Sequence, residues 1–402
     1  MPITVIPTPS GGASYSSQPP ASASSVLLDG QLVTASSIST TVTGTGAPWL
    51  LYANGAGTTT ITIAGTPYTV TAGSTVGTSA YTGSQSVSVA GPVLGVPTTF
   101  TASTLPSSST WYGVAYGNGY FVAVQASTTT AGAYSTNGTS WSASTMPSGG
   151  SANGWQSVAF GNGYFVAVAR YTTSNAYSTD GITWTASTMP SADNWQGITY
   201  GNGKFVAVQG TGNTAGAYST NGTSWNASTM PSAGNWKSVI YGNGYYVAVA
   251  SGTTAGAYST NGTTWTASTM PSAAGWGSVA YGLVGATPTF VAIPYNTTAG
   301  AYSTNGTTWT ANTMPSAFWS CVTYGNGYFI AVSLGPTTAG AYSTNGSTWT
   351  ALTMPSSSDW QSITYGNGKF VAVAQATTAG AYYAFTTFPV AYGIYNGATV
   401  RA

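Results

Sequence analysis

Histidine and glutamate are absent from this 402-residue chain, and only nine of its residues are charged. Without histidine there can be no Ser-His-Asp triad, and a glycosidase needs two acidic side chains flanking the bond that it cleaves. One cysteine and four scattered aspartates are too few for a metal site of histidine, cysteine and carboxylate ligands. We therefore expect no catalytic residues, no metal and no cofactor, and we predict that the protein is not an enzyme.

The charge that is present is small and almost balanced. Five basic residues against four acidic ones give a net charge of +1, so no basic patch can neutralise the phosphates of a nucleic acid. The charged residues are Asp29, Asp180, Asp193, Asp359, Arg170, Lys204, Lys237, Lys369 and Arg401. We expect no nucleic-acid partner.

Long hydrophobic runs and a second cysteine are also missing. No stretch approaches the roughly 18 apolar residues of a membrane span, and the first residues, M-P-I-T-V-I-P, contain no basic segment before an apolar core. We therefore predict neither membrane insertion nor a Sec signal peptide. Cys321 has no partner for an internal disulfide and replaces a serine of the repeat described next, so we expect a small buried residue.

The chain is dominated by a repeat that begins with tryptophan and recurs at spacings of 44, 40, 41, 40, 43 and 41 residues. The opening tryptophans are Trp111, Trp155, Trp195, Trp236, Trp276, Trp319 and Trp360. A period of this length, with four short apolar runs in each copy, is typical of the four-stranded blade of a β-propeller. The seven copies therefore predict an all-β fold with a seven-bladed β-propeller over residues 96–385.

The copy that starts at Trp155 illustrates the expected blade. We predict strands at 157–160, 164–169, 176–179 and 182–187. Gly161-Asn162-Gly163 is expected to form the turn after the first strand. Asp180-Gly181, which is Asn-Gly in the other copies, is predicted to be a two-residue hairpin turn with positive φ at both residues.

The seventh copy is incomplete, and its missing strand is found before the first copy. Trp360 to Ala384 supplies three strands, whereas Phe100 to Ser103 matches the start of a fourth strand. We therefore predict that an N-terminal strand around Phe100–Ser103 pairs with Ala381–Ala384 and closes the last blade. A ring closed in this way has no open sheet edge.

The turn between the third and fourth strands carries a motif. Tyr177 to Trp184, Y-S-T-D-G-I-T-W, resembles the Asp-box of sialidase-like (BNR) propellers, and S-T-N-G-x-x-W repeats it in the other copies. The resemblance implies a propeller in which these turns are structural and lie away from the catalytic centre of that family. The residues given this structural role are Asp180 and the box tryptophans Trp141, Trp184, Trp225, Trp265, Trp309 and Trp349. Such repeats also look like propellers of tailed-phage appendages and bacterial surface proteins.

The regions outside the repeats differ from them in composition. Residues 1–24 are rich in Pro, Ser, Ala and Gly, and predict an extended arm that becomes ordered on binding. Residues 25–95 contain strand patterns, among them the hairpin T-I-T-I-A-G-T-P-Y-T-V-T, and predict a small all-β anchoring domain. Residues 386–402 have no repeat partner, and we expect a C-terminal extension that packs on the ring or on a neighbour.

Candidate ligand-binding residues lie where the copies differ. The segment between the second and third strands departs from the consensus at Arg170, Tyr171, Tyr295 and Asn296, so these four residues are our candidates for ligand binding. Neutral drift in surface loops is the competing explanation. Tryptophans that recur in the copies are interpreted as packing residues, with sugar stacking as the alternative.

Two functional hypotheses remain. The first is a structural and attachment protein of a phage virion, as a fibre, spike or capsid decoration. In it, residues 1–95 bind other virion proteins or copies of the chain, and the propeller is displayed towards a host-surface glycan. The second is an extracellular or cell-surface glycan-binding propeller of a bacterium, similar to an adhesin or lectin. Capsid and tail genes beside its gene would support the first.

Overall fold

The chain consists of β-strands and turns in the part that the structure describes. The computed structural model describes residues 26–28, 31–33, 38–53, 58–71, 75–90, 97–126, 130–148, 154–385 and 392–396. Every helix or strand assigned there is a β-strand, and these residues form no helix long and apolar enough to cross a membrane. Contacts divide the chain into two compact units, Pro97–Ala384 and Met1–Val96 with Phe385–Ala402.

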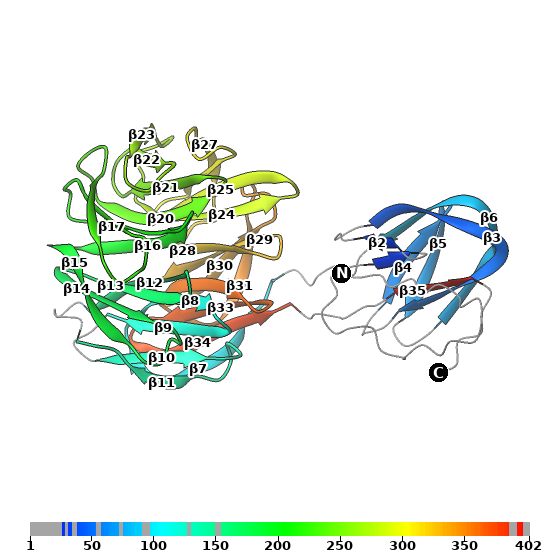
Figure 1. Ribbon diagram of the computed structural model, residues 1–402, viewed down its shortest axis with the longest axis horizontal. Coiled ribbons are helices and arrows are strands. Elements are labelled where there is room, and N and C mark those ends of the chain that lie inside the picture. The colour runs from blue at the N-terminus through cyan, green and yellow to red at the C-terminus, as the bar shows by residue number, and fades with distance from the viewer. Residues whose placement is uncertain are drawn as a thin grey trace. The chain divides into compact units, whose positions relative to one another are not determined.

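The larger unit is a ring of seven four-stranded antiparallel sheets, which are the blades of a propeller (Figure 1). The first strand of each blade is innermost, because it packs on the first strands of both neighbouring blades. The prediction of an all-β seven-bladed propeller is confirmed.

The blades are numbered along the chain, and each is given with its innermost strand first. Blades 1 to 3 are β8 (Trp111–Gly117), β9 (Tyr120–Gln125), β10 (Ala131–Ser135) and β11 (Ser142–Thr145); β12 (Trp155–Gly161), β13 (Tyr164–Ala169), β14 (Thr172–Ser178) and β15 (Thr185–Asp193); and β16 (Trp195–Gly201), β17 (Lys204–Gln209), β18 (Ala215–Ser219) and β19 (Asn226–Thr229). Blades 4 and 5 are β20 (Trp236–Gly242), β21 (Tyr245–Ala250), β22 (Ala255–Ser259) and β23 (Thr266–Thr269); and β24 (Trp276–Val284), β25 (Thr287–Pro294), β26 (Ala299–Ser303) and β27 (Thr310–Thr313). Blades 6 and 7 are β28 (Phe318–Gly325), β29 (Tyr328–Leu334), β30 (Thr337–Ser343) and β31 (Thr350–Ser358); and β32 (Trp360–Gly366), β33 (Lys369–Ala374), β34 (Thr377–Ala384) and β7 (Thr101–Ser109).

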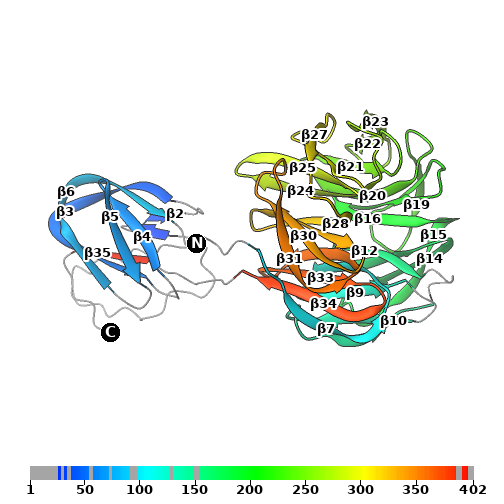
Figure 2. The same cartoon turned by 180° about the vertical axis from the view of Figure 1, so that it is seen from behind.

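Blade 7 is closed by the N-terminal strand, as predicted. β7 pairs antiparallel with β34, with Thr101 opposite Tyr382 and Ala102 opposite Ala381. The two strands lie side by side in both views, β7 in cyan and β34 in red-orange (Figures 1 and 2). The ring is therefore held shut by main-chain hydrogen bonds between two strands whose paired residues Thr101 and Tyr382 are 281 positions apart in the sequence.

The two tight turns of a blade differ from each other. In the turn after the first strand, Asn162 and Gly163 have φ of 47° and 80°, as the two central residues of a type I′ hairpin require. The predicted hairpin at Asp180-Gly181 is wrong, because only Gly181 (φ 72°) takes a positive φ. The third strand ends at Ser178 and the fourth begins at Thr185, rather than at residue 182. A loop stabilised by the Asp180 side chain joins them.

Neighbouring blades approach closely at a glycine near the end of each first strand. A Cβ added to Gly201 would lie only 2.0 Å from the Cγ atom of Tyr241 in the next blade, so no larger residue fits at this approach. The same close approach joins Gly117 to Phe160, Gly161 to Tyr200, Gly242 to Tyr281, Gly282 to Tyr324, Gly325 to Tyr365 and Gly366 to Tyr116. The last pair joins blade 7 to blade 1, so the series runs round the whole ring.

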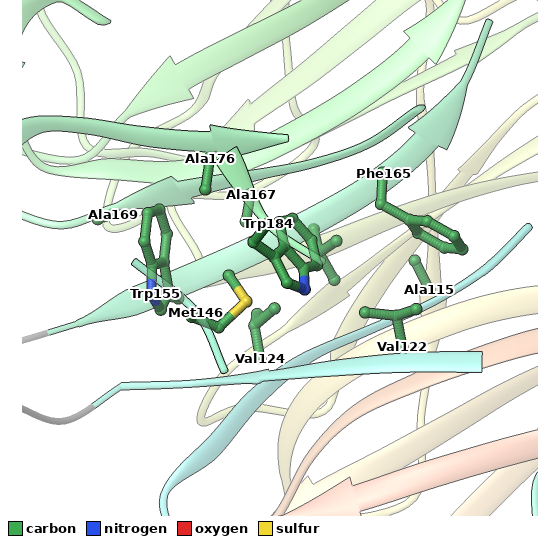
Figure 3. Packing of buried hydrophobic residues seen from close by; sticks show 11 residues of the cluster. Ala115, Val122, Val124, Met146, Trp155, Phe165, Ala167, Ala169, Ala176 and Trp184 are labelled. Carbon is green, nitrogen blue, oxygen red and sulfur yellow. The ribbon is translucent and has the colours of Figure 1, made fainter. Parts of the chain in front are cut away.

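The hydrophobic core lies between blades. Figure 3 shows the core between blades 1 and 2, where Met146, Val122 and Val124 of blade 1 pack with Trp155 and Trp184 of blade 2. Each of these side chains is removed from water, which is the main favourable term in folding. The repeat therefore recurs because each blade supplies one side of two such interfaces.

The smaller unit contains a five-stranded sheet in the order β35-β3-β6-β4-β5 and the hairpin of β1 and β2. The strands are β1 (Val26–Leu28), β2 (Gln31–Val33), β3 (Ile38–Ala53), β4 (Thr58–Ile63), β5 (Thr66–Thr71), β6 (Thr75–Ala90) and β35 (Tyr392–Asn396). β35, red among blue strands in Figure 1, pairs with β3, with Leu51 opposite Ile394. The segment after Phe385, expected as an extension packing on the ring or on a neighbour, thus gives a strand to this sheet. The predicted arm, 1–24, lies outside the described residues.

Candidate functional site

The ring has two ends with different connections. The end that carries the turns after the first and third strands is called the turn face. The end that carries the connections after the second and fourth strands is called the loop face. Contacts between blades agree with this division: on the turn face, Lys204 Nζ donates to the carbonyl of Asn261 at 2.9 Å, and Asn118 Nδ2 donates to the carbonyl of Thr179 at 3.2 Å.

The motif that resembles an Asp-box forms a side-chain-capped loop on the turn face. Asp180 Oδ1 accepts hydrogen bonds from the backbone N–H groups of Ile182 and Thr183, both at 2.8 Å, and from the Ser178 hydroxyl at 2.9 Å. Burial raises the pKa of the Asp180 carboxyl, but these hydrogen bonds outweigh it and hold the pKa below its usual value. The same backbone bonds are accepted by Asn137, Asn221, Asn261, Asn305 and Asn345. One acceptor oxygen is enough, so Asn replaces Asp without loss of the loop.

The tryptophans of the repeat are placed in the cores between blades. All seven opening tryptophans are 0% exposed, so none offers a ring face to a sugar. The indole N–H of Trp195 donates a hydrogen bond to the carbonyl of Ser191, and that of Trp236 donates to the carbonyl of Ser232. The box tryptophans Trp184 and Trp265 are buried, and Trp141, Trp225, Trp309 and Trp349 are half-buried against the same cores.

On the loop face, each first strand carries one residue at a position that varies among the copies. The pairing of the first and second strands shifts register directly after the opening tryptophan, which leaves one extra residue as a β-bulge. The residues at this position are Tyr112, Gln156, Gln196, Lys237, Gly277, Ser320 and Gln361. Because the first strands are innermost, these seven positions lie on the inner strands at the loop face, with Gln in three of them. Their position was missed from the sequence, although its signal was the variability next to an invariant tryptophan.

Two predicted ligand residues, Arg170 and Tyr171, follow β13 on the loop face and contact other blades. The guanidinium carbon of Arg170 lies 4.6 Å from the ring centroid of Tyr112 in blade 1. Tyr171 has a φ of 54° and is 56% exposed, and its hydroxyl accepts a hydrogen bond from Asn194 Nδ2 of blade 3 at 3.2 Å. Burial lowers the pKa of Lys237 in blade 4, and the positive charge of Arg170 lowers it further. Arg170 thus interacts with residues of blades 1 and 4, whereas Tyr171 contacts blade 3.

The other two predicted residues, Tyr295 and Asn296, follow β25 in blade 5 and form a second group. Tyr295 is 45% exposed and its ring centroid lies 6.0 Å from that of Phe318, which is 55% exposed at the start of blade 6. Asn296 faces Gly275, where an added Cβ would lie 3.2 Å from its Oδ1 atom. Phe318 was missed from the sequence, where it replaces the Thr, Gly, Asn or Asp that precedes the opening tryptophan in other copies. The four predicted residues therefore belong to two separate groups on one face.

The acidic residues and the cysteine do not come together. Among the described residues, no three His, Cys, Asp or Glu side chains are close enough to hold a metal ion. Asp193 accepts hydrogen bonds from Asn213 Nδ2, at 2.8 Å, and from the hydroxyl of Ser191. Cys321 lies beside Ser278 and the carbonyl of Ile363 on inner strands of three adjacent blades, and burial raises the pKa of its thiol.

Comparison with known proteins shows the fold. No family model matches the chain, and no curated protein matches its sequence. A streptogramin B lyase structure matches with a TM-score of 0.62 and 13% identity, over 71% of this chain and 97% of the other. Virginiamycin B lyase from Staphylococcus aureus matches with a TM-score of 0.62 and 12% identity, over 70% and 98%. YCF48 bound to D1 peptide matches with a TM-score of 0.56 and 17% identity, over 73% and 98%. The shared feature is the propeller.

These structures correct one prediction and limit another. The expectation that the chain is not an enzyme is contradicted, because solved propellers of this fold include a lyase. Identities of 12–17% show the fold alone, so they assign no reaction to this chain. The seven-bladed propeller is confirmed, but the Asp-box family and the predicted phage virion role receive no support from the comparisons.

Proposed function

We propose that this chain is an attachment protein whose loop face binds a glycan on a host surface, while the smaller unit anchors the chain to a larger assembly. The assembly that we propose is a phage virion, in which the protein is a fibre, spike or capsid decoration. Other virion proteins, or copies of the chain, bind through residues 1–95. The alternative is a bacterial cell-surface or secreted protein that uses the same loop face as an adhesin or lectin does.

One observation carries this proposal: apart from the longer first turn of blade 5, the turns of the turn face keep the same residues in most copies, whereas the loop face varies more. The capped loops of the turn face repeat the same hydrogen bonds in six blades. Residues that the fold requires should recur in every copy, so the positions that differ among the copies are those where folding accepts several residue types. On the loop face the differing side chains include the cations Arg170 and Lys237 and several exposed rings.

The exposed rings favour a glycan as the ligand. Among the described residues, the large apolar side chains that remain exposed are Tyr171, Leu283, Tyr295 and Phe318, and all but Leu283 lie on the loop face. The flat apolar face of an aromatic ring suits the C–H groups of a sugar. The Tyr295–Phe318 pair, with Asn296 beside it in sequence, combines such rings with an amide that can bind hydroxyl groups.

The sheet of the smaller unit suits anchoring. Its order, β35-β3-β6-β4-β5, leaves β35 and β5 as edge strands among the described residues. An edge strand presents unpaired N–H and C=O groups that another chain can join by strand addition, without any need for charge. This chemistry agrees with a chain of only nine charged residues.

Binding of the labelled full-length protein to a glycan panel and to intact bacteria tests the proposal. We expect selective retention that falls about tenfold or more when Tyr295→Ala and Phe318→Ala are combined, because truncation of exposed aromatic contacts removes binding energy. Leu283→Ala is the matched control, since Leu283 is 49% exposed on the turn face of blade 5. Retention that is absent, or that is lost equally in the Leu283→Ala variant, would contradict the proposal. Antibody labelling of purified phage particles and of cells separates the virion from the cell-surface alternative.

A further inference from the structure

We infer that Gly275 and Gly277 in blade 5 open a subsite for an uncharged sugar ring beside the Tyr295–Phe318 pair. The space beside these two glycines is called the glycine gap. The inference rests on the proposed function, because it names the class of glycan that the loop face binds and the residues that decide its fit. The apolar face of the sugar lies on the exposed rings, and its edge enters the glycine gap.

Short distances join the two glycines to the aromatic pair. A Cβ added to Gly277 would lie 3.9 Å from the Cβ of Tyr295, and one added to Gly275 would lie 3.5 Å from that same atom. The ring centroids of Tyr295 and Phe318 are 6.0 Å apart. Asn296 belongs to the same group, because a Cβ added to Gly275 would lie 3.2 Å from its Oδ1 atom. The five residues therefore line one place on the loop face.

The fold does not require glycine at position 277. Gly277 does not take the positive φ that favours glycine, and an added Cβ would meet no heavy atom closer than 3.8 Å outside its chain neighbours. By contrast, a Cβ added to Gly201 would lie 2.0 Å from Tyr241. The other six blades carry a side chain at the position of Gly277, namely Tyr112, Gln156, Gln196, Lys237, Ser320 and Gln361. Blade 5 thus lacks a side chain where the fold accepts one, as expected where a ligand approaches the main chain.

The chemistry of the group suits an uncharged sugar. The pairing of β24 with β25 shifts register between Trp276 and Ser278, so Gly277 is a bulge residue without a paired residue on β25. Gly277 is partly exposed and has no side chain to cover its peptide groups, which a sugar hydroxyl can therefore approach. The rings of Tyr295 and Phe318 suit C–H groups, and the Asn296 amide both donates to and accepts from hydroxyl groups. None of these residues is charged, so the group offers no partner to a carboxylate.

Calorimetric titration of the full-length protein tests the inference. The uncharged probes are the methyl glycosides of glucose, galactose, mannose and N-acetylglucosamine, and sodium glucuronate is the charged one. We expect at least one uncharged glycoside to bind about tenfold or more tightly than glucuronate. Gly277→Gln, which places the residue of blades 2, 3 and 7 in the glycine gap, should weaken that binding about tenfold or more. Gly277→Ala should weaken it less than about threefold, because one methyl group leaves most of the gap open.

The matched control is Gln361→Gly, the reverse exchange at the same position of blade 7, which should leave binding unchanged. The urea midpoint of each variant shows whether the ring is folded. If Gly277→Gln lowers the midpoint, Gly277→Ser introduces the smaller residue of blade 6 and should weaken binding at an unchanged midpoint.

Each other outcome overturns the inference in a recognisable way. Wild-type binding by a folded Gly277→Gln variant would show that the glycine gap plays no part. Equal losses in Gly277→Gln and Gln361→Gly would reject the location, and glucuronate that binds as tightly as the glycosides would reject the uncharged class. No binding of any probe, together with retention on a larger glycan that depends on Tyr295 and Phe318, would reject the inference and leave the proposed function standing.

Discussion

Replacing Leu105 by alanine tests the closure of the ring at a single side chain. Leu105 lies in β7, the N-terminal strand of blade 7, and is 1% exposed in a cluster with Trp111, Val114 and Val373. It takes the place that Met146 takes in the core between blades 1 and 2. A Leu→Ala change at a fully buried site costs about 2–5 kcal/mol, because transfer energy is lost and a cavity remains.

The assay is urea unfolding followed by tryptophan fluorescence. Thirteen of the fourteen tryptophans belong to the propeller repeats, since Trp49 alone precedes them, so the signal reports the ring. With an m-value of about 3 kcal/mol/M or more, a loss of about 3 kcal/mol lowers the midpoint by up to about 1 M. Met146→Ala should give a shift of similar size, and Thr104→Ala, exposed on the same strand, a shift below about 0.5 kcal/mol. A Leu105→Ala midpoint as high as that of Thr104→Ala would refute the closure, because a linker residue is insensitive to truncation.

Three further predictions concern packing, pH and the smaller unit. Gly201→Ala should destabilise the ring by about 1–3 kcal/mol in urea unfolding, because its Cβ would clash with Tyr241. Gly277→Ala should be neutral, because its added Cβ would meet nothing closer than 3.8 Å. Equal losses of stability in the two variants would contradict this explanation of the packing. The lowered pKa of Asp180 means that its carboxylate stabilises the fold above the pKa of the unfolded chain and loses this effect as pH falls through the folded pKa. Wild type should therefore lose stability relative to Asp180→Asn between about pH 5 and pH 2 in thermal melts, and a constant difference would oppose it. Deleting residues 392–402 should remove β35 and lower the melting temperature of the smaller unit without moving that of the propeller, and a joint shift would contradict two independent units.

The sequence predicted the ring because its period is strict, and it missed features that depend on register or on tertiary contact. The repeat spacing and the match at Phe100–Ser103 were enough for the blade number and the closing strand. The loop at Asp180 was predicted as a hairpin because Asp-Gly suits positive φ at both positions, whereas the Asp180 side chain stabilises a longer loop by accepting backbone bonds. The pairing of β35 with β3 had no signal, since those segments share no repeat.

The candidate site could be predicted only in part for the same reason. Variable loops identified Arg170 and Tyr295 by sequence alone, but their grouping with Lys237 and Phe318 depends on which blades are neighbours and on the bulge after each opening tryptophan. Strand periodicity does not reveal that bulge, because the extra residue appears only in the pairing. The bulge residues of the inner strands thus became visible only in the paired sheets.

Hydrogen exchange of the full-length protein, with and without a bound glycan from the panel, tests the central claim most directly. The account predicts slower exchange on the loop face, at the ends of β13 and β25 and at the starts of β20 and β28, with unchanged exchange in the loops around Asn137 and Asp180. Protection confined to those turn-face loops, with the loop face unaffected, would contradict it.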